Sequence, residues 1–245
     1  MSSVLITGAS RGLGLELVKQ YSCRVPDDGL VIAAARNMSP ELGVIVNQEG
    51  SRVVFVAVDI SNESSVLKST PTVTTHLRGK GLDILINNAG VHSWTDGGVS
   101  QMSDLGYQLR VNVTGTHNMI RSYLPLLQSA NVKKVINISS PWGSTSSARD
   151  FYFAPCPAYK ISKAALNSLT VQYALSHEAE GFTFLSVNPG WLRTDMGGSD
   201  GDLSAEEGAS AVADLVASVD TSSNGSFKTI SVSGYDQYSG QTIPW

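Results

Sequence analysis

The chain has 245 residues, 42% of them hydrophobic, and a formal net charge of −4 at pH 7. This size and composition suit one large domain, which we predict to span residues 1–245, and the slight acidity argues against a nucleic-acid or membrane-surface partner. With two cysteines, no secretory signal and no apolar run long enough to cross a membrane, the chain is expected to be cytoplasmic, without a disulfide framework or membrane partner.

Short apolar runs alternate with helical patterns along the chain. We expect strands at 4–6, 30–35, 53–58, 82–86, 135–138, 182–187 and 227–232, and helices at roughly 12–21, 39–49, 63–78, 104–129 and 158–179. Near-continuous hydrophobicity is typical of parallel strands that are covered on both faces. The pattern predicts an α/β fold, a Rossmann-type doubly wound parallel sheet of about seven strands with helices on both faces. We interpret residues 197–204, rich in glycine, serine and aspartate, as a mobile loop.

A glycine-rich turn follows the first expected strand and opens the first helix, with the sequence Thr7-Gly8-Ala9-Ser10-Arg11-Gly12-Leu13-Gly14. Glycines let the backbone turn tightly and approach a pyrophosphate, and the helix N-terminus supplies aligned N–H groups. The turn therefore indicates a dinucleotide site, with a plain glycine-rich turn as the alternative.

The end of the second strand indicates which nicotinamide cofactor is preferred. An acidic residue is expected about 20 residues beyond the glycines when NAD is preferred, but the strand ends in Ala35 and Arg36. Arg36 and Arg11 could bind a 2′-phosphate through charge-assisted, bidentate hydrogen bonds. We predict NADP(H); the alternative is that Arg36 is a solvated residue at the strand end.

Tyr159 and Lys163 stand four residues apart, so both side chains lie on one face of a helix. An ammonium group near a phenol stabilises the phenolate and lowers the pKa of the phenol, which makes Tyr159 a candidate general acid or base. Taken alone, such a pair is more often part of a solvated helix.

Five motifs in order make the chain resemble a short-chain dehydrogenase/reductase. They are the turn at 7–14, Asp59, Asn87-Asn88-Ala89-Gly90, Tyr159-x-x-x-Lys163 and Pro189-Gly190. Within that family the chain most resembles the sniffer-type carbonyl reductases and their C-factor-like relatives, through residues 189–198 and the terminal Pro244-Trp245.

The resemblance implies how NADP(H) would be held. Asp59 and the Ile60 backbone would contact the adenine, although Asp59 could equally serve as a turn or N-cap residue, and residues 87–90 could be only a polar turn. The expected cofactor-binding residues are Gly8, Ser10, Arg11, Gly12, Leu13, Gly14, Arg36, Asp59, Ile60, Asn87, Ala89, Gly90, Tyr159, Lys163, Pro189, Gly190, Leu192 and Thr194.

The resemblance also implies a reaction. Ser140, with Ser139 as the alternate, would hydrogen-bond the substrate carbonyl, and Tyr159 would donate a proton to it. Lys163 would lower the tyrosine pKa and bind the nicotinamide ribose, and Asn112 would hold a water that relays protons. The alternatives are serines that bond turn backbone and a mid-helix asparagine that faces solvent or bonds its own helix.

The segment before Tyr159 departs from the family pattern. Tyr159 follows Ser140 by 19 residues, where many family members have roughly 13, so we expect a surface excursion within 144–157 at the rim of the active site. Apolar and aromatic residues would form a pocket for a small ring-bearing ketone, aldehyde or quinone. The candidate pocket residues are His92, Trp94, Trp142, Phe151, Phe153, Trp191 and Met196.

We therefore predict NADPH-dependent carbonyl reduction. A non-catalytic NADP-binding sensor, or an epimerase, dehydratase or cyclase on the same scaffold, remains an alternative. The four histidines have no metal-like spacing, so no metal site is expected. A homodimer is possible through the helices at 104–129 and 158–179, unless the excursion blocks it. Its apolar contacts would be Leu124, Leu126, Leu127, Leu166, Leu169 and Tyr173.

Overall fold

A single seven-stranded sheet organises residues 3–245, the part of the chain that this computed structural model describes. Every strand pairing in it is parallel, and the order is β3-β2-β1-β4-β5-β6-β9. The strand bounds are β1 (Ser3–Thr7), β2 (Leu30–Ala35), β3 (Val53–Ala57), β4 (Ile84–Asn87), β5 (Lys134–Ile138), β6 (Thr183–Asn188) and β9 (Ser226–Thr229). The predicted Rossmann-type sheet is confirmed, and its order reverses between β1 and β4, where such sheets bind ligands.

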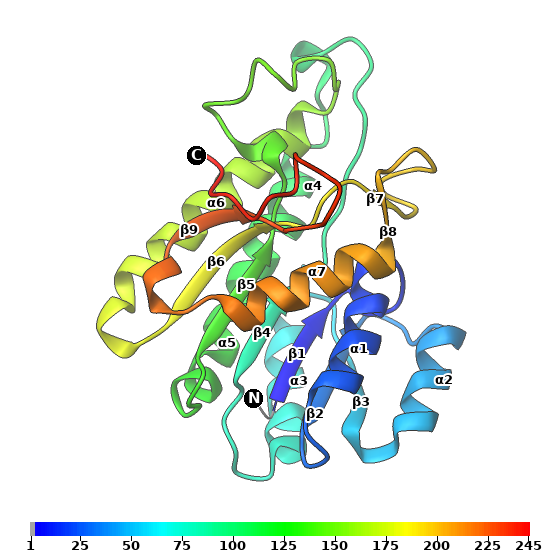
Figure 1. Cartoon of the computed structure of the whole chain (residues 1–245), viewed down its shortest axis with the longest axis vertical. Coiled ribbons are helices and arrows are strands. Elements are labelled where there is room, and N and C mark those ends of the chain that lie inside the picture. Colours follow the sequence, from blue (N-terminus) through cyan, green and yellow to red (C-terminus); the bar gives the residue numbers. More distant parts are fainter. Residues whose placement is uncertain (1–2) are drawn as a thin grey trace.

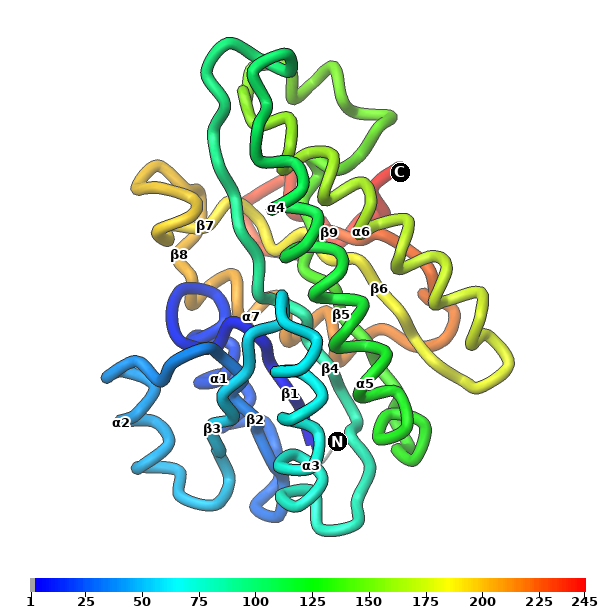
Figure 2. The backbone as a smooth tube through the Cα atoms, turned by 180° about the vertical axis from the view of Figure 1, so that it is seen from behind, coloured from blue at the N-terminus to red at the C-terminus, as the bar shows by residue number. Residues whose placement is uncertain are grey.

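Helices cover both faces of the sheet (Figures 1 and 2). One face carries α1 (Gly12–Arg24), α2 (Pro40–Glu49) and α7 (Ala205–Ser218). The other face carries α3 (Glu63–Leu77), α5 (Thr116–Gln128) and α6 (Pro157–Ser176). All residues of β1 and β2 are buried, because each strand contributes side chains to two apolar cores, one on either face.

The helix expected at 104–129 is interrupted. It consists of α4 (Leu105–Leu109), a π-helical turn (Arg110–Gly115) and α5. The last strand is also shorter than expected, because the chain turns after Thr229 and its following residues form bridges with the C-terminal segment.

Helix α7 was not predicted, although the sequence carries a signal for it. The Ser204 hydroxyl accepts a hydrogen bond from the Glu207 N–H (3.1 Å), and the Glu207 carboxylate accepts one from the Ser204 N–H (2.7 Å). This is the reciprocal capping box that S-x-x-E indicates at a helix start.

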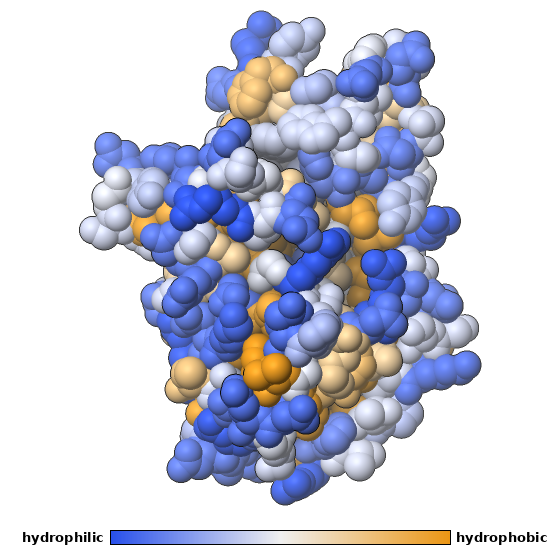
Figure 3. Space-filling model, turned by 90° about the vertical axis from the view of Figure 1, so that its right-hand side faces the viewer, coloured by the Kyte–Doolittle hydropathy of each residue, from blue (hydrophilic) through white to orange (hydrophobic). Residues whose placement is uncertain are grey.

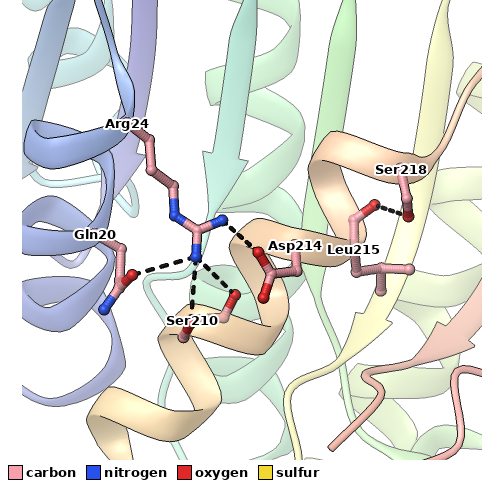
Figure 4. A network of polar contacts seen from close by, with 6 residues as sticks. All are labelled: Gln20, Arg24, Ser210, Asp214, Leu215 and Ser218. Atoms are coloured by element: carbon pink, nitrogen blue, oxygen red, sulfur yellow. Dashed lines mark hydrogen bonds and ion pairs between the residues drawn. The ribbon is translucent and has the colours of Figure 1, made fainter.

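Polar contacts join α7 to α1 (Figure 4). Arg24 forms an ion pair with Asp214 (2.6 Å) and donates hydrogen bonds to the Ser210 hydroxyl and to Gln20. At the far end of α7 the Ser218 hydroxyl donates to the Leu215 carbonyl (2.9 Å). These contacts hold α7 against the helix whose N-terminus carries the glycine turn.

Three long connections gather at the carboxyl edge of the sheet, at the top of Figure 1. Residues 88–104 follow β4, residues 139–156 follow β5, and residues 189–204 follow β6. The third connection contains β7 (Leu192–Arg193) and β8 (Leu203–Ser204), which pair with each other. Figure 3 views the side on which β7 and β8 lie and shows the upper part projecting above a mainly hydrophilic surface with scattered hydrophobic patches.

The connection after β5 contains the expected surface excursion. Tyr152 and Phe153 are 88% and 75% exposed. The backbone on either side of the excursion is anchored: the Pro155 carbonyl accepts a hydrogen bond from the Thr95 N–H (2.7 Å), and the Ser144 hydroxyl donates to the Pro244 carbonyl (2.6 Å). Within residues 3–245, none of the helices is both long and apolar enough to cross a membrane.

Two residues predicted to lie in a subunit interface are core residues instead. Leu127 is fully buried and Leu166 is 2% exposed, because both face their own subunit's interior. Leu124, Leu126, Leu169 and Tyr173 are partly exposed.

Candidate active site

The glycine turn packs too closely for side chains at two positions. A Cβ atom on Gly14 would lie 2.1 Å from the Gly8 carbonyl oxygen, and one on Gly8 would lie 2.9 Å from the Ala89 Cα. Gly8 also has a φ of +69°, which L side chains rarely adopt. The turn therefore requires glycine at both positions to pack against residues 88 and 89; Leu13 is buried beneath it and Ser10 is partly exposed.

Two arginines stand beside this turn. Thr7 of β1 pairs with Ala34 of β2, so Arg36 lies next to the turn at the sheet edge. Arg36 is exposed and has no ion pair within residues 3–245. Arg11 forms an ion pair with Asp195 (2.7 Å), and both side chains are 75% exposed. This contact between residues 184 positions apart was not predicted from the sequence.

Asp59, which follows β3, acts as a turn residue. Its Oδ1 accepts hydrogen bonds from the Ser61 N–H (2.9 Å) and hydroxyl (2.7 Å). The neighbouring Ile60 side chain is buried and contacts Gly115, so only its backbone is available to a ligand.

The Asn87-to-Gly90 motif ties β4 to its neighbouring strands. Asn88 donates to the Thr7 carbonyl (2.9 Å), and the Ala89 N–H donates to the Thr7 hydroxyl (3.0 Å). Asn87 donates to Asn137 of β5 (2.9 Å), while its own Oδ1 is buried without a partner within the described residues. The motif is thus more than a polar turn, because it fixes the strand ends around the switch point.

Asn112 lies in the π-helical turn and joins two parts of the site. It is 1% exposed, and its amide exchanges hydrogen bonds with the Val91 backbone, accepting from N–H (2.8 Å) and donating to C=O (2.9 Å). It also donates to the Ser162 hydroxyl on α6 (2.9 Å). Asn112 therefore neither faces solvent nor bonds its own helix through its side chain. A Cβ on Gly90 would lie 3.2 Å from the Asn112 Oδ1 and 3.8 Å from Lys163 Nζ. The segment after β4, the π-helical turn and α6 therefore meet at this point.

Ser140, and not Ser139, faces Tyr159. The Ser140 side chain lowers the pKa of the Tyr159 phenol through hydrogen bonding, and its hydroxyl accepts a hydrogen bond from the Trp142 N–H (3.2 Å). Ser139 is buried and donates to Asn167 (2.6 Å). Of the two strand-end serines, only Ser140 can present its hydroxyl beside the phenol.

The pKa of Tyr159 differs from our expectation. Burial raises it, and this effect outweighs the hydrogen bond from Ser140 that lowers it. Lys163 Nζ lies 5.5 Å from the phenol ring centroid and donates to the Ile138 carbonyl (2.8 Å). Burial also lowers the pKa of Lys163 to about 8. Desolvation disfavours the charged form of both groups, so Tyr159 is a protonated phenol at neutral pH in this structure.

Three of the predicted pocket residues gather around Tyr159. The His92 and Tyr159 ring centroids are 4.8 Å apart, as are those of His92 and Trp94. Trp142 lies 6.2 Å from Tyr159 and 6.0 Å from Trp94. Trp94 is 58% exposed and forms the outer member of this ring cluster, which we define as His92, Trp94, Trp142 and Tyr159.

The other predicted pocket residues lie outside the ring cluster. Phe151 is partly exposed and Phe153 is largely exposed on the excursion. Trp191 and Met196 are about half exposed around β7, and the Trp191 indole donates to the Gly197 carbonyl (2.7 Å). Within residues 3–245, the rings of Phe151, Phe153 and Trp191 form no ring pair with the cluster.

The segment after β6 reaches back to the glycine turn. Gly190, which follows Pro189, has a φ of +85°. Leu192 packs its side chain under α7, so only its backbone could contact a cofactor. Thr194 lies against Gly12, whose Cβ position is 3.4 Å from the threonine methyl. The phenol of Tyr238, which the sequence reasoning missed, accepts a hydrogen bond from the Trp191 N–H (2.9 Å).

Comparisons with known proteins agree with this geometry. Residues 2–203 match the family model described as short chain dehydrogenase. The short chain dehydrogenase virK of Hypocrea virens is 33% identical over 205 residues, which cover 79% of this chain and 75% of that protein.

Two solved structures are similar over the whole chain. The NADPH-bound carbonyl reductase from chicken fatty liver has a TM-score of 0.88 at 25% identity, covering 100% of this chain and 99% of that one. The carbonyl reductase Sniffer of D. melanogaster has a TM-score of 0.88 at 27% identity and covers 100% of both chains.

Proposed function

The chain belongs to the short-chain dehydrogenase family and is an oxidoreductase of that family, which uses nicotinamide cofactors; we propose that it reduces the carbonyl group of a small apolar or aromatic ketone, aldehyde or quinone with NADPH. The observation that carries this proposal is the convergence of Ser140, Tyr159 and Lys163 at the carboxyl end of β5. The similarity to two carbonyl reductases supports the same reaction type.

The residues present suit NADP(H). Glycines at positions 8 and 14 leave no room for a Cβ and keep the backbone N–H groups at the start of α1 accessible. Arg36 offers a guanidinium without an ion pair within residues 3–245, where an acidic residue would favour NAD, and Arg11 stands in the glycine turn, paired with Asp195. The chicken carbonyl reductase is described as NADPH-bound, which supports this choice.

The side chains have complementary parts in the proposed reaction. NADPH, when bound, supplies the hydride. Ser140 orients the substrate carbonyl oxygen, and Tyr159, kept protonated by burial, donates its proton to that oxygen. Lys163, with a pKa of about 8, is mostly cationic at pH 7 and stabilises the phenolate that remains. Asn112 holds the Val91 backbone and Ser162 in place, and we propose that it also positions the water that reprotonates Lys163 after Lys163 has returned a proton to the Tyr159 phenolate.

One experiment tests the function directly. The purified protein is mixed with NADPH and a panel of ketones, aldehydes and quinones, and NADPH consumption is followed while the product is identified. We expect alcohol or hydroquinone formed in equal amount to the NADPH consumed. NADP+ that stays bound while the substrate is rearranged would instead indicate an epimerase, dehydratase or cyclase, and binding without turnover would indicate a sensor.

We further propose that residues 1–245 form one domain, that the protein is cytoplasmic, and that it forms a homodimer through α5 and α6. The free cysteines Cys23 and Cys156 suit a reducing compartment. The partly exposed Leu124 and Leu169 support the interface. Light scattering that gives the mass of one chain at micromolar concentration would contradict the dimer.

A further inference from the structure

The imidazole of His92 has a buried nitrogen, Nε2, without a hydrogen-bond partner within residues 3–245. Leaving a buried polar group unpaired costs free energy, so native proteins usually satisfy such groups. Among the described side chains with an atom of this kind, only His92 has a ring in contact with Tyr159. A hydrogen-bond partner for His92 Nε2 would therefore lie close to the Tyr159 phenol.

His92 is the polar member of the ring cluster beside the phenol. Its ring meets Tyr159 edge to face, with centroids 4.8 Å apart and an interplanar angle of 79°. It meets Trp94 in the same manner, at 4.8 Å and 85°, and lies 6.1 Å from Trp142. A flat substrate ring would find apolar contact with the two tryptophans, while the imidazole offers a hydrogen bond.

The imidazole is neutral, and its Nε2 has an unused hydrogen-bonding capacity within residues 3–245. Burial lowers the pKa of His92, and this outweighs the raising effect of the Asp104 carboxylate. Asp104 accepts hydrogen bonds from Ser93 and Gln108, and no hydrogen bond joins it to the imidazole within residues 3–245. A neutral imidazole has one N–H donor and one acceptor. His92 can therefore recognise an oxygen atom, and it does not compete with Tyr159 as the proton donor.

We propose that His92 is a specificity residue that hydrogen-bonds a second oxygen of the substrate, on a carbon close to the carbonyl that Tyr159 protonates. This inference rests on the proposed carbonyl reduction and names its substrate class: ring-bearing ketones with a neighbouring carbonyl or hydroxyl group. A site with a buried polar group discriminates against an analogue that leaves the group unpaired. A simple aryl ketone would be such an analogue.

The test compares two substrates and one substitution. His92→Phe keeps a ring and removes both nitrogens. The probes 1-phenylpropane-1,2-dione and 1-phenylpropan-1-one share a carbon skeleton and differ in the second oxygen. We expect the ratio of kcat/KM for the dione to kcat/KM for the ketone to fall about tenfold in the variant, because one hydrogen bond to a buried group is lost. Dividing the variant's ratio by the wild-type ratio cancels the difference in intrinsic reactivity.

Two further variants separate recognition from packing. His92→Gln keeps a hydrogen-bonding group and should recover part of the ratio. Trp94→Phe reduces the apolar contact and keeps both imidazole nitrogens, so it should change kcat/KM for the two probes by the same factor and leave their ratio unchanged. The unfolding temperature of His92→Phe should not fall, since an unpaired polar group is removed from a buried position.

Each remaining outcome decides between the two proposals. If His92→Phe lowers kcat/KM equally for both probes, or for neither, the recognition of a second oxygen by His92 is wrong while carbonyl reduction stands. If the wild-type protein reduces no carbonyl compound with NADPH, the proposed function fails and this inference fails with it.

Discussion

The two sides of the proposed site are built differently. On the cofactor side, the glycine turn and residues 87–90 are joined by hydrogen bonds between side chains and backbone, and Gly8 and Gly14 have no space for an added Cβ. On the substrate side, residues 91–104, 139–156 and 191–204 are long connections with exposed aromatic side chains. Where the protein backbone contacts a ligand closely, particular residue types are needed at particular positions. A pocket made of loop side chains tolerates many sequences. The cofactor side can therefore be recognised from sequence motifs, whereas the substrate side cannot.

The largest expected effect comes from Tyr159, which stands between the two sides. Tyr159→Phe removes the proton donor, so kcat should fall about 100-fold or more while the Kd for NADPH stays nearly unchanged. Stopped-flow turnover and fluorescence titration measure the two quantities. Tyr152→Phe is the matched control, because the same hydroxyl is removed from a side chain that is 88% exposed. Wild-type turnover in Tyr159→Phe would show that the assigned chemistry is wrong.

The second-largest effect is expected from Gly14→Ala, which tests how tightly the cofactor side is packed. Gly14→Ala places a Cβ 2.1 Å from the Gly8 carbonyl oxygen, so the free energy of unfolding should fall by about 3 kcal/mol and NADPH binding should be lost. Gly43→Ala, in helix α2, meets only a methionine sulfur at 3.5 Å and should raise stability by about 0.5–1 kcal/mol. Equal urea midpoints for the two variants would remove the contrast between the regions.

Much of the fold could be predicted because buried parallel strands are nearly continuous apolar runs, and all seven expected strands are present. The π-helical turn was not predictable, because the hydrogen bonds that hold Asn112 come from Val91 and Ser162, distant in sequence. Helix α7 was missed although its S-x-x-E signal is local. The capping box of Ser204 and Glu207 is enough to predict where this helix starts, so α7 could have been predicted from the sequence.

The candidate site shows the same division. The side chains of Ser140, Tyr159 and Lys163 are brought together, as their motifs predict. The direction of the Tyr159 pKa shift was wrong, because sequence spacing reveals the neighbouring charge but not the burial that opposes it. Phe153 and Trp191 were placed in the pocket on residue type alone, and the loops that carry them keep them outside the ring cluster.

Reversing a charge on the cofactor side should change the preference between NADPH and NADH, whereas the same change on the substrate side should not. Arg36→Asp should lower the preference for NADPH over NADH by at least about tenfold, equivalent to about 1.4 kcal/mol, because a carboxylate repels the 2′-phosphate. Arg149→Asp makes the same change on the exposed excursion and should leave the preference intact. Calorimetric Kd values for both cofactors check this, and equal affinities in the wild type would contradict the assignment of NADP(H).

The smallest predicted effect concerns pH. Burial holds the pKa of Lys163 at about 8, below its ordinary value of 10.5. Between these values the unfolded chain binds more protons than the folded protein, so stability rises with pH. Relative to Lys163→Met, the free energy of unfolding should increase by about 1 kcal/mol from pH 8 to pH 9. A pH-independent difference in urea unfolding would show that the Lys163 pKa is not lowered.

The π-helical turn at 110–115 has a consequence for how this chain tolerates insertions and deletions. A π turn holds one more residue than the α turn that it replaces. The apolar faces of α4 and α5 therefore stay aligned although the chain between them contains one extra residue. Deleting a single residue there would let the helix close regularly, without shifting the apolar faces on either side. The rest of the protein would keep its register, and Asn112 alone would lose its place between Val91 and Ser162. This is a point at which the length of the chain, rather than the identity of a side chain, sets the geometry of the site.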